Sequence, residues 1–136
     1  MSVRFSFEYG GENSFGKIHR PVAKVSFKSP KENIWIETQM IVDTGADFTI
    51  LPRFLAKNLR ISLEHDCIKE LTSGIGGDQS IYLYKYKIQI KIGALERHVP
   101  IAFFDNNEVP PLLGRTGFLE TFDTEFLKSH EVVFKD

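Results

Sequence analysis

The chain has little of several features that mark specialised protein classes. Cys67 is its one cysteine, so no disulfide can form within a chain, which is typical of a reducing compartment. Its 17 basic and 18 acidic residues give a net charge of −1, without the basic excess of nucleic-acid-binding proteins. Residues 1–7 alternate apolar and polar side chains, unlike a signal peptide or a membrane span. We therefore expect a cytoplasmic protein with no nucleic-acid or membrane partner.

The 136 residues are 42% hydrophobic, which suits one compact domain with its own core. Apolar side chains recur at every second position in most segments, and this period predicts strands. We expect strands at 3–7, 22–27, 34–42, 48–51, 68–72, 79–92, 95–104 and 131–134, a loop at 9–14, and short helices at 53–59 and 116–122. The pattern predicts a mostly antiparallel β-barrel or sandwich with one or two short helices.

One segment places a carboxylate directly after an apolar strand. It reads Ile41-Val42-Asp43-Thr44-Gly45-Ala46-Asp47. Gly45 lets the backbone turn tightly and lets a substrate or a second loop approach without a Cβ in the way. Strand-to-turn junctions also favour Asp, Thr and Gly, so this segment taken alone fits an ordinary turn equally well.

Two further segments contain glycine at places where a backbone must turn or come close. The first, Gly74-Ile75-Gly76-Gly77, is the predicted tip of a hairpin that can fold over a bound chain, although many exposed hairpins use glycine for the turn alone. The second is Pro110-Pro111-Leu112-Leu113-Gly114-Arg115, which leads into the second predicted helix. An arginine at a helix N-terminus opposes the helix dipole, so we expect Arg115 to pair with a buried carboxylate.

These three segments, in this order, resemble the retropepsins, the retroviral-type aspartic proteases and their cellular relatives. The resemblance covers about residues 20–125. It implies an all-β fold, a closed barrel of short antiparallel strands with a flap hairpin, in a single domain spanning residues 1–136. The N-terminal strand and loop at 1–17 and the helix after Pro52 have no counterpart in the smallest viral enzymes.

The resemblance also implies a role for each matching residue. Asp43 is the expected catalytic aspartate, in an active-site loop with Thr44, Gly45 and Ala46. Thr44 is expected to bond across a dimer axis, and Arg115 to orient Asp47 in a partly buried ion pair. The expected substrate-binding residues are Asp47, the flap residues Gly74, Ile75, Gly76 and Gly77, and the pocket residues Ile41 and Leu112.

A complete aspartic protease site needs two carboxylates that share one proton. This chain contains one Asp-Thr-Gly motif. The similar segment Asp123-Thr124-Glu125 lacks the glycine and is interpreted as a helix end. The second carboxylate must then come from a second copy, so we expect a homodimer with two-fold symmetry. The expected activity is cleavage of peptide or protein substrates within extended apolar segments, with water as nucleophile and no metal or other cofactor.

An alternative is a catalytically silent retropepsin-like module that binds peptides or only dimerises. An intact Asp43 loop argues against a pure binder, which needs no paired carboxylates, and a glycine-rich flap is a needless loss of order in a scaffold. The four histidines lack the spacing of metal ligands. Cys67 is expected to be buried rather than nucleophilic.

Overall fold

The computed structural model describes residues 1–74 and 77–136, and its strands follow the period of two in the sequence. In β5 (Trp35–Val42), Met40 and Val42 are buried, whereas Glu37 and Gln39, which precede them on the opposite face, are exposed. This alternation is the normal consequence of side chains pointing to opposite faces of a strand. The apolar face of β5 therefore lies on the core.

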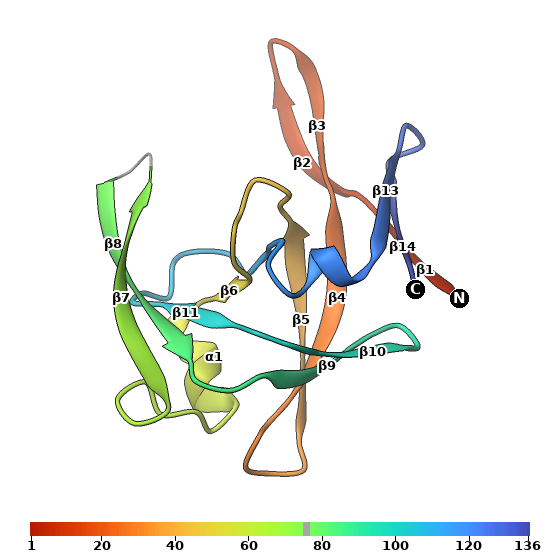
Figure 1. The fold of residues 1–136 in the computed structure, drawn as a ribbon. Helices are drawn as coiled ribbons and strands as arrows, with labels where there is room; N and C mark the ends of the chain where they lie inside the picture. Colours follow the sequence, from red (N-terminus) through yellow and green to blue (C-terminus); the bar gives the residue numbers. More distant parts are fainter. Residues whose placement is uncertain (75–76) are drawn as a thin grey trace.

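Most strands belong to one curled sheet. Its order is β10 (Leu95–Val99), β9 (Ile88–Ile92), β4 (Val22–Lys28), β5, β12 (Leu112–Leu113), β6 (Ile50–Leu51), β11 (Ala102–Phe104), β8 (Gly77–Tyr84) and β7 (Cys67–Gly74). Neighbouring strands are antiparallel except for β5 with β12 and β6 with β11, which are parallel. The sheet curls into a half-barrel (Figure 1).

The all-β class predicted from the sequence is confirmed, with two corrections to its details. Among the described residues, the edge strands β10 and β7 do not pair with each other, so the sheet is a half-barrel and not the expected closed barrel. The two parallel pairs also show that the strands are not uniformly antiparallel. Both parallel pairs lie in the middle of the sheet.

A second, smaller sheet contains both ends of the chain. Its order is β1 (Ser2–Ser6), β14 (Glu131–Lys135) and β13 (Asp123–Leu127), with antiparallel pairing throughout. The two termini therefore lie side by side, as Figure 1 shows. The Phe134 ring packs edge-on against Phe5 and Phe122, with ring centroids 6.1 Å and 5.7 Å away. Phe134 and Phe122 belong to the main apolar cluster, so they join the terminal sheet to the main core.

The remaining elements are short. β2 (Glu8–Asn13) and β3 (Gly16–Arg20) form a two-stranded hairpin of their own. The helix α1 (Arg53–Asn58) begins directly after Pro52, and a 3₁₀ helix spans Leu119–Thr121. No helix among the described residues is long and apolar enough to cross a membrane.

Several predicted element boundaries are wrong, each for a local reason. The predicted loop at 9–14 lies mostly within strand β2, which pairs with β3. The predicted strand 79–92 divides at the turn 85–87, and the predicted strand 95–104 divides at Pro100, since proline has no N–H to donate to a neighbouring strand.

The C-terminal helix was also overestimated from the sequence. Of the predicted helix 116–122, only the 3₁₀ turn at Leu119–Thr121 forms. The interpretation of 123–125 as a helix end is wrong as well, because Asp123 begins strand β13. The N–H groups of Thr121 and Phe122 donate to carbonyl oxygens three residues earlier, as in a single 3₁₀ turn. Phe118 and Phe122 are buried on either side of this turn, so packing against the core also holds the segment.

Cys67 is a core residue, as expected from the sequence. It is buried in the main apolar cluster at the start of β7. Desolvation, assisted by the neighbouring negative charge of Asp66, raises the pKa of the Cys67 thiol to about 11. The thiol is therefore neutral at physiological pH, and the thiolate needed for nucleophilic chemistry is scarce.

The role of Phe134 in joining the two sheets can be tested by truncation. Phe134 is completely buried, so Phe134→Ala is expected to lower the free energy of unfolding by about 3–5 kcal/mol through lost packing and a cavity. Phe126, on the neighbouring strand β13, is exposed, and Phe126→Ala is expected to cost less than about 0.5 kcal/mol. Chemical denaturation at one fixed protein concentration measures both. Equal losses in the two variants would contradict the assignment.

Candidate active site

Asp43 is the first residue after β5, and a neighbouring strand holds it in place. β12 runs parallel to the end of β5, with Leu112 opposite Ile41 and Leu113 opposite Val42. The N–H of Asp43 donates to the carbonyl oxygen of Leu113 at 3.0 Å. The backbone of Asp43 thus continues the sheet, so the position of its carboxylate is set by the core beneath.

The carboxylate of Asp43 is oriented by the loop that follows it, residues 43–49, called here the Asp43 loop. The N–H of Gly45 donates to Asp43 Oδ1 at 2.9 Å, and the N–H of Ala46 donates to the Asp43 carbonyl oxygen at 3.1 Å. An Asp side chain that accepts from the backbone two residues later forms a tight turn. Asp43 is half-buried, whereas Thr44 and Gly45 are exposed. The chain therefore presents one oriented carboxylate beside an uncovered turn.

A second loop, residues 114–116 and called here the Gly114 loop, contacts the Asp43 loop at a buried point. The N–H of Gly114 donates to Thr49 Oγ1 at 3.1 Å, and Thr49 is only 1% exposed. A Cβ on Gly114 would lie 2.1 Å from the carbonyl oxygen of Phe48, so only glycine fits without a backbone shift. The loss of the acceptor of a buried N–H lowers the free energy of unfolding by about 1–3 kcal/mol.

Two more backbone hydrogen bonds join the same two loops. The N–H of Arg115 donates to the carbonyl oxygen of Ala46 at 3.0 Å. The N–H of Thr116 donates to the carbonyl oxygen of Asp47 at 2.9 Å. Together with the Gly114 contact, these bonds make the two loops one structural unit around Asp43.

Arg115 and Asp47 form an ion pair through Arg115 Nη2 and Asp47 Oδ1. The sequence predicted a partly buried pair, and this is wrong for the single chain. The side chains are 49% and 69% exposed, because both project outward from the joined loops. An exposed pair contributes about 0–1 kcal/mol to stability, so backbone hydrogen bonds hold the loops together more than charge does.

The apolar residues expected to line substrate pockets lie beside the Asp43 loop. Ile41 and Leu112 are half-buried and opposite each other in the parallel pair of β5 and β12. Leu112 also packs against a small apolar cluster that contains Ile50, Ile81 and Phe104. The structure thus brings both predicted pocket residues next to Asp43.

The hairpin expected to form a flap consists of β7 and β8. Gly74 and Gly77 are paired at its described end, and the Ser73 hydroxyl donates to Asp78 Oδ1 at 2.8 Å. The other two predicted flap residues, Ile75 and Gly76, lie outside the described residues. Figure 1 shows the hairpin on the same side of the molecule as the Asp43 loop.

A pocket of about 220 Å³ opens between the Asp43 loop and the β8–β11 part of the sheet. Its lining is mostly apolar and consists of Phe48, Thr49, Leu83, Tyr84, Pro100, Ile101, Ala102 and Thr116. Apolar walls with a few polar groups are usual in ligand sites. The pocket is of a size to take one apolar side chain.

The sequence contains one Asp-Thr-Gly, and the similar segment Asp123-Thr124-Glu125 lies in a different sheet from β5. Asp123 is exposed on β13, in the terminal sheet. Across residues 1–74 and 77–136, no three His, Cys, Asp or Glu side chains gather in a group that could hold a metal ion. His19 and His130 instead stack on each other, with ring centroids 4.1 Å apart.

Sequence reasoning missed Thr49, which was placed within a short apolar strand at 48–51. The structure shows that its hydroxyl is the acceptor that joins the two loops. A signal was available, since a lone hydroxyl within an apolar run must find a hydrogen-bond partner once it is buried. The partner is the N–H of Gly114, 65 residues away, and nothing in the sequence around Thr49 identifies it.

Comparison with known proteins agrees with this geometry. A profile described as aspartyl protease matches residues 34–116, a span that runs from the start of β5 to the Gly114 loop. Among solved structures, a retropepsin-like aspartic protease from Rickettsia conorii is similar, with a TM-score of 0.64 and 15% sequence identity over 98% of each chain. A match at this identity shows a shared fold. No curated protein matches the chain in sequence.

The hydrogen bond between Thr49 and Gly114 can be tested by two nearly isosteric changes. Thr49→Val removes the acceptor, so the Gly114 amide is expected to exchange with solvent deuterium at least about tenfold faster, and stability to fall by about 1–3 kcal/mol. Thr49→Ser keeps the hydroxyl and is expected to keep the amide protected, although it loses a buried methyl group. Amide exchange followed by NMR measures both. Equal protection in the two variants would show that Thr49 does not join the loops.

Proposed function

Because the chain belongs to the aspartyl protease family and has a retropepsin-like fold, we propose that it is an aspartic endopeptidase active as a homodimer. The observation that supports this most is the carboxylate of Asp43, oriented by the N–H of Gly45 at the end of a buried strand. One such group per chain makes half of a catalytic pair. The uncovered turn at Thr44 and Gly45 is where a second copy must approach to complete it.

In the proposed reaction, the two Asp43 carboxyl groups share one proton and hold a water between them. The ionised carboxylate takes a proton from the water as the water oxygen bonds to the scissile carbonyl carbon. The neutral carboxyl gives its proton to the carbonyl oxygen. The tetrahedral intermediate then collapses, the C–N bond breaks, and the amine leaves with a proton returned by the pair. The water is the nucleophile, and no metal ion or other cofactor takes part.

The proposed substrate is an extended peptide with apolar side chains. Ile41 and Leu112 offer apolar surface next to Asp43, and the pocket lined by Phe48 offers a second apolar site beside the Asp43 loop. The exposed Asp47 carboxylate can accept a hydrogen bond from the substrate backbone. The β7–β8 hairpin, with Gly74 and Gly77 near its end, is proposed to close over the bound chain.

The catalytic role of Asp43 is tested by Asp43→Asn, which keeps the size of the side chain but removes the ionisable group. Cleavage of a peptide library is expected to fall by at least about 100-fold, since acid–base catalysis is lost. Folding and pairing are expected to survive, as judged by circular dichroism and sedimentation. Asp123→Asn, the same change on an exposed aspartate of the terminal sheet, is the matched control and is expected to retain wild-type turnover.

Two outcomes would count against the proposal. An Asp43→Asn protein that cleaves at the wild-type rate would show that Asp43 is not catalytic. A wild-type protein that pairs but cleaves no member of a broad library between pH 3 and pH 7 would favour a silent peptide-binding or dimerisation module.

A further inference from the structure

The β2–β3 hairpin, called here the arm, projects from the molecule without a layer to support it. Its two strands pair only with each other among the described residues, and Figure 1 shows them extending beyond both sheets. It precedes the residues that match the aspartyl protease profile. A two-stranded hairpin alone is marginally stable in water, so an arm of this kind needs a surface to pack on.

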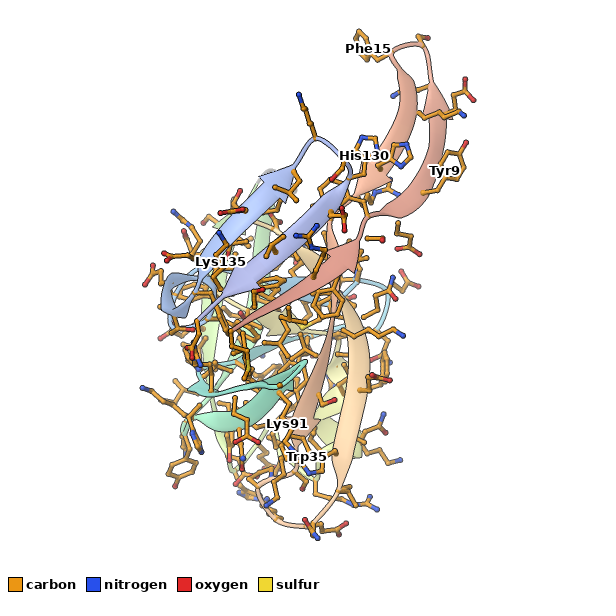
Figure 2. All side chains as sticks on the ribbon, turned by 90° about the vertical axis from the view of Figure 1, so that its right-hand side faces the viewer. Tyr9, Phe15, Trp35, Lys91, His130 and Lys135 are labelled. Carbon is orange, nitrogen blue, oxygen red and sulfur yellow. The ribbon has the colours of Figure 1, made fainter. Side chains whose placement is uncertain are left out.

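The tip of the arm carries a fully exposed aromatic side chain. Phe15 is 101% exposed, and Figure 2 shows it at the outer end of the hairpin. Its N–H donates to Asn13 Oδ1 at 2.9 Å, which fixes the turn. Single exposed apolar residues are common on protein surfaces. This one differs in standing at the end of a projecting element, where its own chain cannot cover it.

The base of the arm is held firmly, so its direction is set. The His19 ring stacks on His130 at 4.1 Å, and His130 stacks on Phe7 at 5.7 Å. Tyr9 packs edge-on against His19 at 5.9 Å, and the N–H of Phe7 donates to the carbonyl oxygen of His130 at 2.8 Å. These contacts join the arm to the turn between β13 and β14. A pre-ordered arm loses little entropy on contact with a partner.

The arm points to the side of the molecule that carries the Asp43 loop. In Figure 1, β5 runs upward to that loop, and the arm extends upward beyond it. Figure 2, turned by 90° about the vertical axis, again shows the arm at the top of the molecule. The six residues of β2 span roughly 20 Å. A second copy that brings its own Asp43 to this face must therefore come alongside the arm.

We propose that the arm clasps the second copy of the chain in the catalytic dimer, with Phe15 as its apolar anchor. The proposal rests on the homodimer of the proposed function and adds the element that holds it. Two-fold symmetry repeats the contact, one arm on each side of the axis. The charged residues of the arm balance, with Glu8 and Glu12 against Lys17 and Arg20, so the contact is expected to depend on apolar burial more than on charge.

The test is the dissociation constant of the dimer, measured by sedimentation equilibrium. Phe15→Ser is expected to raise it at least about tenfold, because each dimer loses two aromatic anchors. Its thermal midpoint at high protein concentration is expected to stay near that of the wild type, since Phe15 makes no part of the core. Phe54→Ser is the matched control, because Phe54 is also exposed but lies on α1, at the opposite end of the molecule in Figure 1. It is expected to leave the dissociation constant unchanged.

Peptidase activity separates a failure of the arm from a failure of the proposed function. At protein concentrations that saturate dimer formation, the Phe15→Ser protein is expected to cleave at the wild-type rate, and on dilution to lose activity sooner. A wild-type dissociation constant for the Phe15→Ser protein would overturn the arm proposal and leave the proposed protease function standing. The same conclusion follows if the dissociation constant is unchanged and only the KM for protein substrates rises. A wild-type protein that stays monomeric at all concentrations and still cleaves would overturn both the arm and the dimer.

Discussion

The hydrogen bond from the Gly114 N–H to Thr49 Oγ1 is the contact on which the candidate site depends. It joins two loops that lie 65 residues apart in the chain, at a point too close for any side chain on residue 114. The neighbouring backbone bonds at Ala46 and Asp47 follow from that approach. Because β12 leads directly into Gly114 and pairs with β5, the same contact also positions Asp43. The contact between Thr49 and Gly114 thus supports the backbone that carries Asp43, while the N–H of Gly45 orients its carboxylate.

The exposed charges around the site are of secondary importance to its architecture. Arg115 and Asp47 face solvent, where water and salt screen their attraction. The loops keep their shape through backbone hydrogen bonds, and the proposed function leaves Asp47 and Arg115 for contact with a bound peptide. The inner side of the two loops is constrained by close packing, whereas the exposed side chains are not.

The pattern of burial changes sharply at Asp43. Asp43 is half-buried, yet the adjacent Thr44 and Gly45 are exposed. The terminal strands, β1 and β14, pair with each other within one chain. The chain therefore pairs its own ends, and a separate projecting element, the arm, extends at the same end of the molecule as the Asp43 loop. In the proposed dimer, the paired carboxylates and the arm that holds the second copy come from different parts of the sequence.

The sequence by itself determined the β class, the strands β4, β5 and β14, the helix after Pro52, and the identity of Asp43 and its loop. These depend on local rules: side chains alternate along a strand, proline begins a helix, and glycine permits a tight turn. Only the tertiary structure decided the partner of Thr49, the exposure of the Arg115 pair and the half-open sheet. The arm escaped prediction because residues 9–14 bury little and so show no alternation. Contacts between distant segments depend on how the whole sheet curls, and no local pattern records that.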